Sequence, residues 1–99
     1  MRIVAGRFKG RRLHAPSGSE IRPTSDRVRE SIFNIILHGL KGWKGSLHDA
    51  AVIDVFAGTG SLGLETLSRG AAHATFIDNS PASLAITKKN AAHLGIWRN

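Results

Sequence analysis

The spacing of apolar and polar residues predicts several short elements, and a pair of strands comes first. Residues 2–13 are interpreted as two short strands in which Arg7, Lys9 and Arg11 alternate with apolar or small residues and therefore share one face. Residues 14–23 contain Pro, Ser and Gly, which is typical of a loop. The chain is thus predicted to open with a basic β-hairpin and a loop.

An amphipathic helix is predicted next. Thr24 or Ser25 can cap its first turn, and Asp26 places an anion where the helix dipole favours one. The apolar residues of this helix recur at helical spacing and form one stripe, made of Val28, Ile32, Ile35, Ile36 and Leu40. Gly39 is expected to end the helix, and residues 41–51 to form a loop.

The second half of the chain alternates between strands and helices. Residues 52–56 and 74–78 are short apolar runs, typical of strands that are buried on both faces. Each run precedes a predicted helix, at residues 62–69 and 81–95, and Ser80 caps the second helix. This order predicts a βαβα unit with a parallel sheet, so the fold class is α/β.

The composition fits one domain without metal or disulfides. Ninety-nine residues suffice for one domain and are too few for two. The chain has no cysteine, and its five histidines show no ligand spacing, so no metal site is predicted. No apolar run approaches the roughly 20 residues that a membrane-spanning helix needs. We therefore expect a cytoplasmic protein.

The net charge of +7 is concentrated near the N-terminus. Residues 1–29 contain eight basic and two acidic side chains, and seven of the eight basic ones are Arg. Guanidinium groups bind phosphate bidentately and stack on bases, so the excess favours nucleic-acid contact over a merely solvated surface. The residues expected to make this contact are Arg7, Lys9, Arg11 and Arg12.

A glycine-rich turn follows the first predicted strand of the sheet. Gly58, Gly60 and Gly63 match the pattern G-x-G-x-x-G, between a strand and a helix as that motif requires. Glycines let the backbone turn tightly and approach a ligand, and the helix amides beyond them can meet negative charge. The spacing fits either a nicotinamide dinucleotide or a methyl donor.

Two aspartates bear on the choice of cofactor. Asp78 ends the next strand, where its carboxylate can accept hydrogen bonds from both hydroxyls of a ribose. Alternatively, Asp78 has only a structural role at the start of the following helix. Asp54 lies inside an apolar strand, where a carboxylate is costly without a partner. A cationic ligand group such as the ammonium of a methionine moiety would be a partner, so Asp54 favours the methyl donor.

Four blocks in order make the sequence resemble a known family. They read RIVAGRFKGRRL at 2–13, RPTSDRVRESIFNI at 22–35, DVFAGTGSLGLE at 54–65 and LSRGA at 67–71. These blocks closely resemble the RsmD family of 16S rRNA (guanine-N2)-methyltransferases. The resemblance implies the N-terminal part of a Rossmann-like methyltransferase fold, and methylation of a guanine N2 in 16S rRNA with S-adenosyl-L-methionine as donor.

The resemblance also implies roles for single residues. The methionine part of the cofactor would be lined by Asp54, Phe56, Gly58 and Gly60. Asp78 would hold the ribose, with Asn79 and Ser80 near the adenosine. Thr24 and the start of its helix would close over the amino-acid end of the cofactor.

The family's catalytic motif, Asp/Asn-Pro-Pro-Tyr/Phe after the fourth strand, is missing. The chain has three prolines, none adjacent, and no tyrosine, so no catalytic residue is assigned. We expect residues 1–20 to be a basic RNA-contacting hairpin and loop, and residues 21–99 to be the N-terminal half of the methyltransferase domain. Such a fragment would bind the cofactor without activity, and its open sheet edge would favour a homodimer.

Two other functions stay open. The chain can be a non-catalytic RNA-binding module in which the basic hairpin makes the contacts. The glycine spacing also permits a nicotinamide-binding Rossmann half. The leading interpretation names 16S rRNA or the small ribosomal subunit as the partner.

Overall fold

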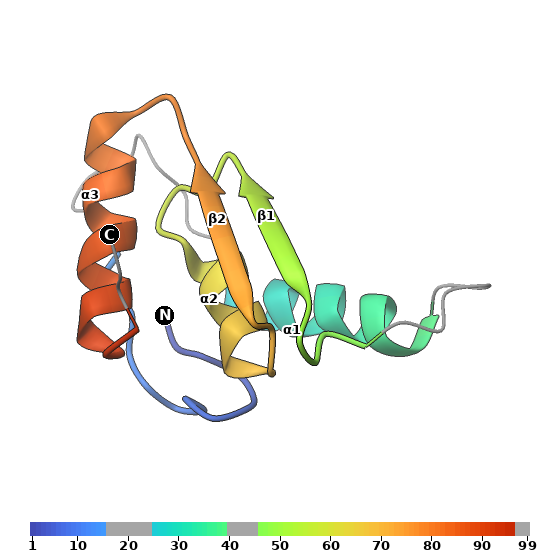
Figure 1. Cartoon of the computed structure of the whole chain (residues 1–99). Coiled ribbons are helices and arrows are strands. Elements are labelled where there is room, and N and C mark those ends of the chain that lie inside the picture. Colours follow the sequence, from blue (N-terminus) through green and yellow to red (C-terminus); the bar gives the residue numbers. More distant parts are fainter. Residues whose placement is uncertain (16–24, 40–45, 97–99) are drawn as a thin grey trace.

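The computed structural model describes residues 1–15, 25–39 and 46–96. Within these three ranges, two strands and four helical segments follow one another (Figure 1). In order they are α1 (Asp26–Asn34), the π-helix η1 (Ile35–Gly39), β1 (Ala51–Val55), α2 (Ser61–Ser68), β2 (His73–Ile77) and α3 (Pro81–His93). None of the helices in these three ranges is long and apolar enough to cross a membrane.

The two strands form a parallel sheet, as predicted. Ala51 pairs with His73 at one end and Val55 with Ile77 at the other, so both strands end at the same edge. In Figure 1, α2 lies behind the strands and α3 stands beside β2. The βαβα order and the α/β class are therefore confirmed, with each strand beginning one residue earlier than predicted.

The expectation that both faces of the strands are buried was wrong for the described part of the chain. Asp54 is buried and Phe76 half-buried, and both lie close to Gly63 of α2. The alternate residues point the other way and are exposed, including Ile53, Val55 and Ile77. Because α2 covers one face only, the strands alternate between buried and exposed positions.

Serine side chains cap two of the helices. The hydroxyl of Ser25 accepts a hydrogen bond from the Val28 amide at 3.1 Å, and that of Ser80 accepts one from the Ser83 amide at 3.3 Å. Thr24, the other candidate cap for α1, lies outside the described residues. The predicted first helix continues to Gly39, although its last five residues are π-helical.

The apolar stripe predicted for this helix forms its buried face only in part: Ile32 and Ile36 are half-buried, and Leu40 lies outside the described residues. Val28 is 51% exposed and Ile35 is 56% exposed, whereas the buried residues of α1 are Arg29 and Phe33. Arg29 can be buried because its guanidinium binds the carboxylates of Asp26 and Glu65. Its charge is thus neutralised inside the fold, and it does not belong to the basic surface counted from the sequence.

The N-terminal segment folds back on itself, but the two predicted strands do not form. One isolated antiparallel bridge joins Arg2 and Arg12, supported by a hydrogen bond from the Ile3 amide to the Arg11 carbonyl at 3.0 Å. Ile3 and Leu13 enter the main hydrophobic core, which also contains Leu64, Ala91 and Leu94. Packing against α2 and α3 therefore holds this segment, in place of a longer strand ladder.

Candidate functional site

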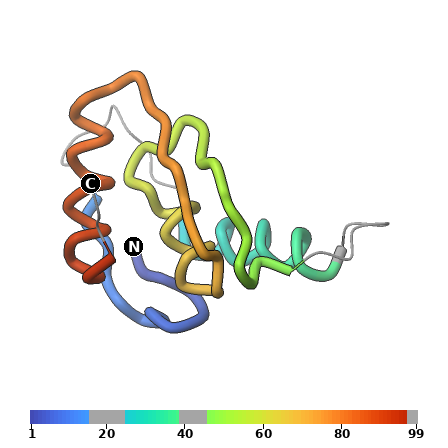
Figure 2. The backbone as a smooth tube through the Cα atoms, in the orientation of Figure 1, coloured from blue at the N-terminus to red at the C-terminus, as the bar shows by residue number. Residues whose placement is uncertain are grey.

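The glycine turn lies at the carboxyl edge of the sheet, beside the loop that leaves β2 (Figure 2). Gly58 and Gly60 have φ values of +58° and +81°, which residues with a Cβ rarely adopt. A Cβ on Gly60 would lie 2.8 Å from Cγ2 of Thr87. A Cβ on Gly63 would lie 2.4 Å from Cε1 of Phe76. The first two glycines thus shape the turn, and the third brings α2 against the sheet.

Asp78 connects the glycine turn to the end of β2. Its Oδ2 accepts a hydrogen bond from the Gly58 amide at 2.9 Å, and its Oδ1 accepts one from the Ser80 amide at 2.9 Å. These two backbone hydrogen bonds hold the pKa of Asp78 below its ordinary value. The helix-entry role considered for Asp78 is therefore present, together with a link to the turn. Each carboxylate oxygen keeps a second lone pair with which to accept from a ligand.

Asp54 is 8% exposed and has a partner within the fold. Its Oδ2 accepts a hydrogen bond from the Gly63 amide in the first turn of α2, at 3.0 Å. Burial raises the pKa of Asp54, this hydrogen bond lowers it, and the charge of Asp78 raises it further. From the sequence, Asp54 is predicted to bind a cationic ligand group. In the structure a backbone amide already accounts for one of its oxygens.

Phe56 is the first residue after β1 and has an unusual backbone. Its φ is +62°, in the left-handed region that a bulky residue enters only at a cost of order 1–3 kcal/mol. Its ring is not packed in the core, because the residue is 84% exposed. An exposed aromatic ring is thus held at the sheet edge next to the glycine turn.

The structure brings all the described cofactor candidates to this edge. Asp54 is the last residue but one of β1, just before the turn. Phe56 and the glycines form the turn, and Asp78, Asn79 and Ser80 make up the neighbouring loop. Thr24 lies outside the described residues. A cavity of about 250 Å³ lies next to Asp54, between β1 and the helical segment α1–η1, and Ile32 and Ile36 line its far side.

Two buried polar residues of α3 hold the turn, and the sequence argument missed both roles. Thr87 donates its hydroxyl hydrogen to the Gly58 carbonyl at 2.9 Å, and Asn90 donates Nδ2 to the Thr59 carbonyl at 2.9 Å. Asn90 also accepts from the His14 amide at 2.6 Å and donates to the His14 carbonyl at 3.1 Å. The available signal was a polar amide on the apolar face of a predicted helix, because such a residue requires partners.

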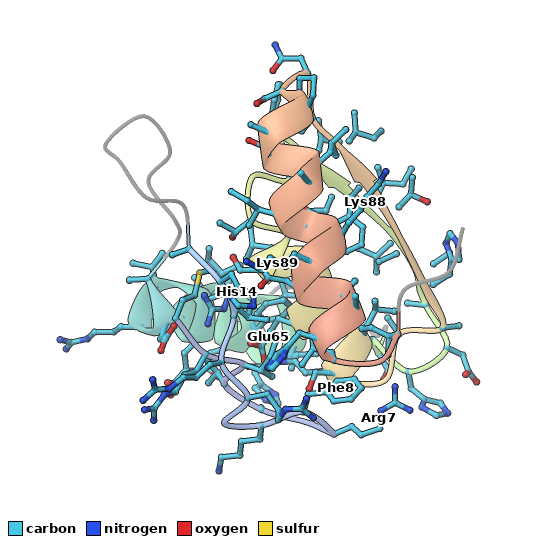
Figure 3. The ribbon with its side chains drawn as sticks, turned by 90° about the vertical axis from the view of Figure 1, so that its left-hand side faces the viewer. Arg7, Phe8, His14, Glu65, Lys88 and Lys89 are labelled. Carbon is cyan, nitrogen blue, oxygen red and sulfur yellow. The ribbon has the colours of Figure 1, made fainter. Side chains whose placement is uncertain are left out.

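Glu65 forms a second buried centre that sequence reasoning did not identify. It is 0% exposed, and it accepts hydrogen bonds from the amides of Val4 at 2.8 Å and Ala5 at 3.0 Å. The Nε of Arg69 lies 3.0 Å from its Oε2, and the Nε of Arg29 lies 3.5 Å from its Oε1. One carboxylate therefore joins the N-terminal segment, α1 and α2 (Figure 3).

The predicted nucleic-acid contacts Arg7, Lys9, Arg11 and Arg12 are all exposed. The guanidinium of Arg7 lies 4.4 Å from the ring centroid of Phe8, and Arg11 donates Nη2 to the His93 carbonyl at 2.9 Å. The four side chains thus remain on the surface, while the backbone that carries them is fixed to α2 and α3.

Comparison with known proteins places this arrangement in a family. The family described as "Conserved hypothetical protein 95" matches residues 1–99. The putative rRNA methyltransferase YlbH of Bacillus subtilis is 40% identical over 105 residues, which cover 100% of this chain and 53% of that protein. Ribosomal RNA small subunit methyltransferase D of Escherichia coli is 44% identical over 95 residues, which cover 95% of this chain and 44% of that protein.

Solved structures of similar proteins have a fold like that of this chain. A putative methyltransferase from Escherichia coli superposes with a TM-score of 0.75 at 42% identity, over 96% of this chain and 47% of that one. A putative methylase from Haemophilus influenzae gives a TM-score of 0.61 at 36% identity, over 94% of this chain and 44% of that one. The chain spans about half the length of the relatives that it matches. By sequence and by fold, the chain belongs to the RsmD family, whose members include rRNA small subunit methyltransferases.

Proposed function

We propose that the protein takes part in S-adenosyl-L-methionine-dependent methylation of a guanine N2 in 16S rRNA, in the cytoplasm. The observation that carries the proposal is the glycine turn, which the Asp78 carboxylate joins to the end of β2. That geometry alone suits a dinucleotide as well. The methyltransferase names of the relatives favour the methyl donor.

The residues at the sheet edge fit this cofactor. The space beside Gly58 is open, so a ligand can approach the main chain there, and the missing Cβ of Gly60 lets the turn pack against Thr87. Asp78 has lone pairs for the two ribose hydroxyls. Asp54 and Asp78 place two carboxylates near a donor that carries a sulfonium and an ammonium group. When bound, S-adenosyl-L-methionine supplies an electrophilic methyl group.

Each remaining candidate has an assigned task in this proposal. Phe56 offers its exposed ring to the methionine part of the cofactor, and Asn79 and Ser80 lie beside the adenosine. Thr24, ahead of α1, closes over the amino-acid end. These residues bind and orient the donor, which contributes to rate by positioning the methyl group for in-line attack.

Residues 1–99 bind the donor in this proposal and do not transfer the methyl group by themselves. The Asp/Asn-Pro-Pro-Tyr/Phe motif, which would accept the amine hydrogens and stack on the base, is absent from these residues. Residues 21–99 would then be the cofactor-binding half of the methyltransferase domain. Residues 1–20 would contact 16S rRNA or the small ribosomal subunit through Arg7, Lys9, Arg11 and Arg12.

The open edges of the sheet add a proposal about assembly. Within the described residues β1 and β2 pair only with each other, so both are edge strands with unpaired backbone groups, and Ile53, Val55 and Ile77 are exposed apolar residues on them. Edge strands of this kind promote pairing with another chain. We therefore expect the 99-residue chain to form a homodimer through the sheet edge, which light scattering after size-exclusion chromatography would detect.

Isothermal titration calorimetry tests the cofactor assignment. S-adenosylhomocysteine should bind to the folded protein with measurable heat, and NADH should give none. The reverse result, with NADH bound and S-adenosylhomocysteine ignored, would show that the turn serves a nicotinamide cofactor and would overturn the proposal.

A further inference from the structure

Two segments without acidic residues lie side by side on one face of the protein. Residues 1–15 contain five basic side chains and no carboxylate, and residues 79–96 contain two lysines and no carboxylate. Figure 3 shows the N-terminal segment passing along the lower half of α3, with His14 next to this helix. Residues that are far apart in sequence thus form one surface.

Direct contacts fix these two segments to each other. Asn90 makes two hydrogen bonds with the backbone of His14, at 2.6 and 3.1 Å. The rings of His14 and His93 meet edge-on, with centroids 5.7 Å apart. Arg11 donates to the carbonyl of His93, which places a cation at the negative end of the helix dipole. The N-terminal segment and the last two turns of α3 are therefore fixed relative to each other.

Lys89 and His93 are one helical turn apart, so their side chains lie on the same side of α3. Both are exposed, whereas Asn90 between them faces inward and is fully buried. Lys88 differs from Lys89, because it lines a cavity together with β2 residues such as Thr75. The two lysines leave α3 on different sides (Figure 3).

The nearest carboxylates do not cancel the charge of this surface. Glu65 is fully buried and binds Arg29 and Arg69. Asp26 binds Arg29 and accepts a hydrogen bond from the Arg2 amide at 3.0 Å. Glu65 and Asp26 are thus already engaged with other cations, and they leave the positive charges of Arg11 and Lys89 on the surface formed by Arg11, His14, Lys89 and His93.

We propose that α3 contributes Lys89 and His93 to the RNA-binding surface, together with Arg11 and His14. These four residues form what we call the α3 basic face, and it binds the phosphate backbone of RNA. Clustered Lys and Arg side chains bind phosphates by neutralising them and releasing counterions. The inference rests on the proposed function, which makes RNA the substrate.

The position of the α3 basic face relative to the glycine turn supports this assignment. Asn90 binds His14 on one side and the Thr59 carbonyl of the glycine turn on the other. RNA bound to this face would therefore be held at a fixed distance from the cofactor.

The test compares two neighbouring lysines. Binding of a fluorescein-labelled RNA stem-loop is followed by fluorescence anisotropy over a range of salt concentrations for the wild type, Lys89→Glu and Lys88→Glu. Both variants change the net charge equally, on the same helix. We expect Lys89→Glu to weaken binding roughly tenfold and Lys88→Glu to weaken it far less. In Lys89→Ala the slope of log K against log salt should shrink by about 0.9 for a lost duplex phosphate contact.

Equal losses in Lys88→Glu and Lys89→Glu would mean that net charge alone attracts RNA, and would overturn the proposal. Wild-type affinity in Lys89→Glu would overturn it as well. Calorimetry with S-adenosylhomocysteine on the same Lys89→Glu sample separates this failure from a failure of the proposed function. Unchanged cofactor binding and an unchanged thermal transition show that any lost RNA affinity comes from the surface itself.

Discussion

Asp78 and Gly58 are joined by a hydrogen bond of 2.9 Å from the Gly58 amide to the carboxylate, which ties the end of β2 to the turn after β1. The same carboxylate accepts from Ser80 at the start of α3. A ligand that binds Asp78 therefore meets the glycine turn and the helix entry together.

Replacing Asp78 by Ala should weaken the binding of S-adenosylhomocysteine roughly tenfold or more, because hydrogen bonds to a charged acceptor are lost. Asp78→Asn should retain part of the affinity, since it keeps one acceptor oxygen. Calorimetry measures both variants. Glu30→Ala removes an exposed carboxylate from α1 and serves as the matched control. Equal affinity in Asp78→Ala and the control would exclude Asp78 as a ribose ligand.

The buried carboxylate of Asp54 predicts an unusual pH dependence of the stability of the fold. Its pKa is raised in the folded state, mainly by burial, so the folded protein holds this proton more tightly than the unfolded chain. The carboxylate therefore destabilises the fold above its folded pKa, and this penalty disappears as the pH falls toward the ordinary value of 3.8. Asp54→Asn should melt at a higher temperature than the wild type at pH 7.

The advantage of Asp54→Asn should shrink as the pH is lowered, which thermal melts at a series of pH values would show. Asp54→Ala leaves the Gly63 amide without its acceptor and should cost about 1–3 kcal/mol. If Asp54→Asn were less stable than the wild type at every pH, the charged carboxylate would be a net stabilising group and the sign of this prediction would be wrong.

Glu65→Ala should destabilise the fold by about 3–5 kcal/mol, because it leaves the buried Arg29 without this partner. It also removes the acceptor for the amides of Val4 and Ala5. Urea unfolding followed by circular dichroism measures the loss. Glu30→Ala, at an exposed position, should change stability by less than about 0.5 kcal/mol. Similar midpoints for the two variants would contradict the role given to Glu65.

Gly63→Ala and Gly58→Ala should be harmful for different reasons. A Cβ at position 63 would lie 2.4 Å from the Phe76 ring, so overpacking should cost about 1–3 kcal/mol. At position 58 no atom lies within 4 Å, and the cost of about 1–2 kcal/mol comes from the positive φ. Adding Phe76→Leu should restore part of the stability of Gly63→Ala and none of that of Gly58→Ala. Restoration in both would show that the distinction is wrong.

Local signals made much of the fold predictable. The Ser80–Pro81 start of α3, the glycine turn and the alternation of strands and helices depend on residues close together in sequence, and each is confirmed. The buried face of α1 depends on partners that are not local. Arg29 is buried because Glu65, thirty-six residues later, accepts its charge. Apolar periodicity carries no information about such a partner, so the predicted stripe includes the exposed Val28 and Ile35 and omits Arg29.

The candidate site likewise has one part that local sequence predicts and another part that only the packing reveals. The turn and Asp78 were found because a motif with fixed spacing contains them. Thr87 and Asn90 hold that turn from another element, and only the packing of α3 reveals it. The N-terminal segment was predicted as strands because its residues alternate. Its short bridge instead results from anchoring to Ser68 and Glu65, which the alternation does not encode.

The buried carboxylate of Glu65 also sets an order of assembly. Val4 and Ala5 emerge first during synthesis, but the acceptor for their amides lies 61 and 60 residues downstream. Closing so long a loop costs entropy before any contact is gained, which slows folding. The first residues of the chain therefore cannot form these two hydrogen bonds until Glu65 of α2 is in place.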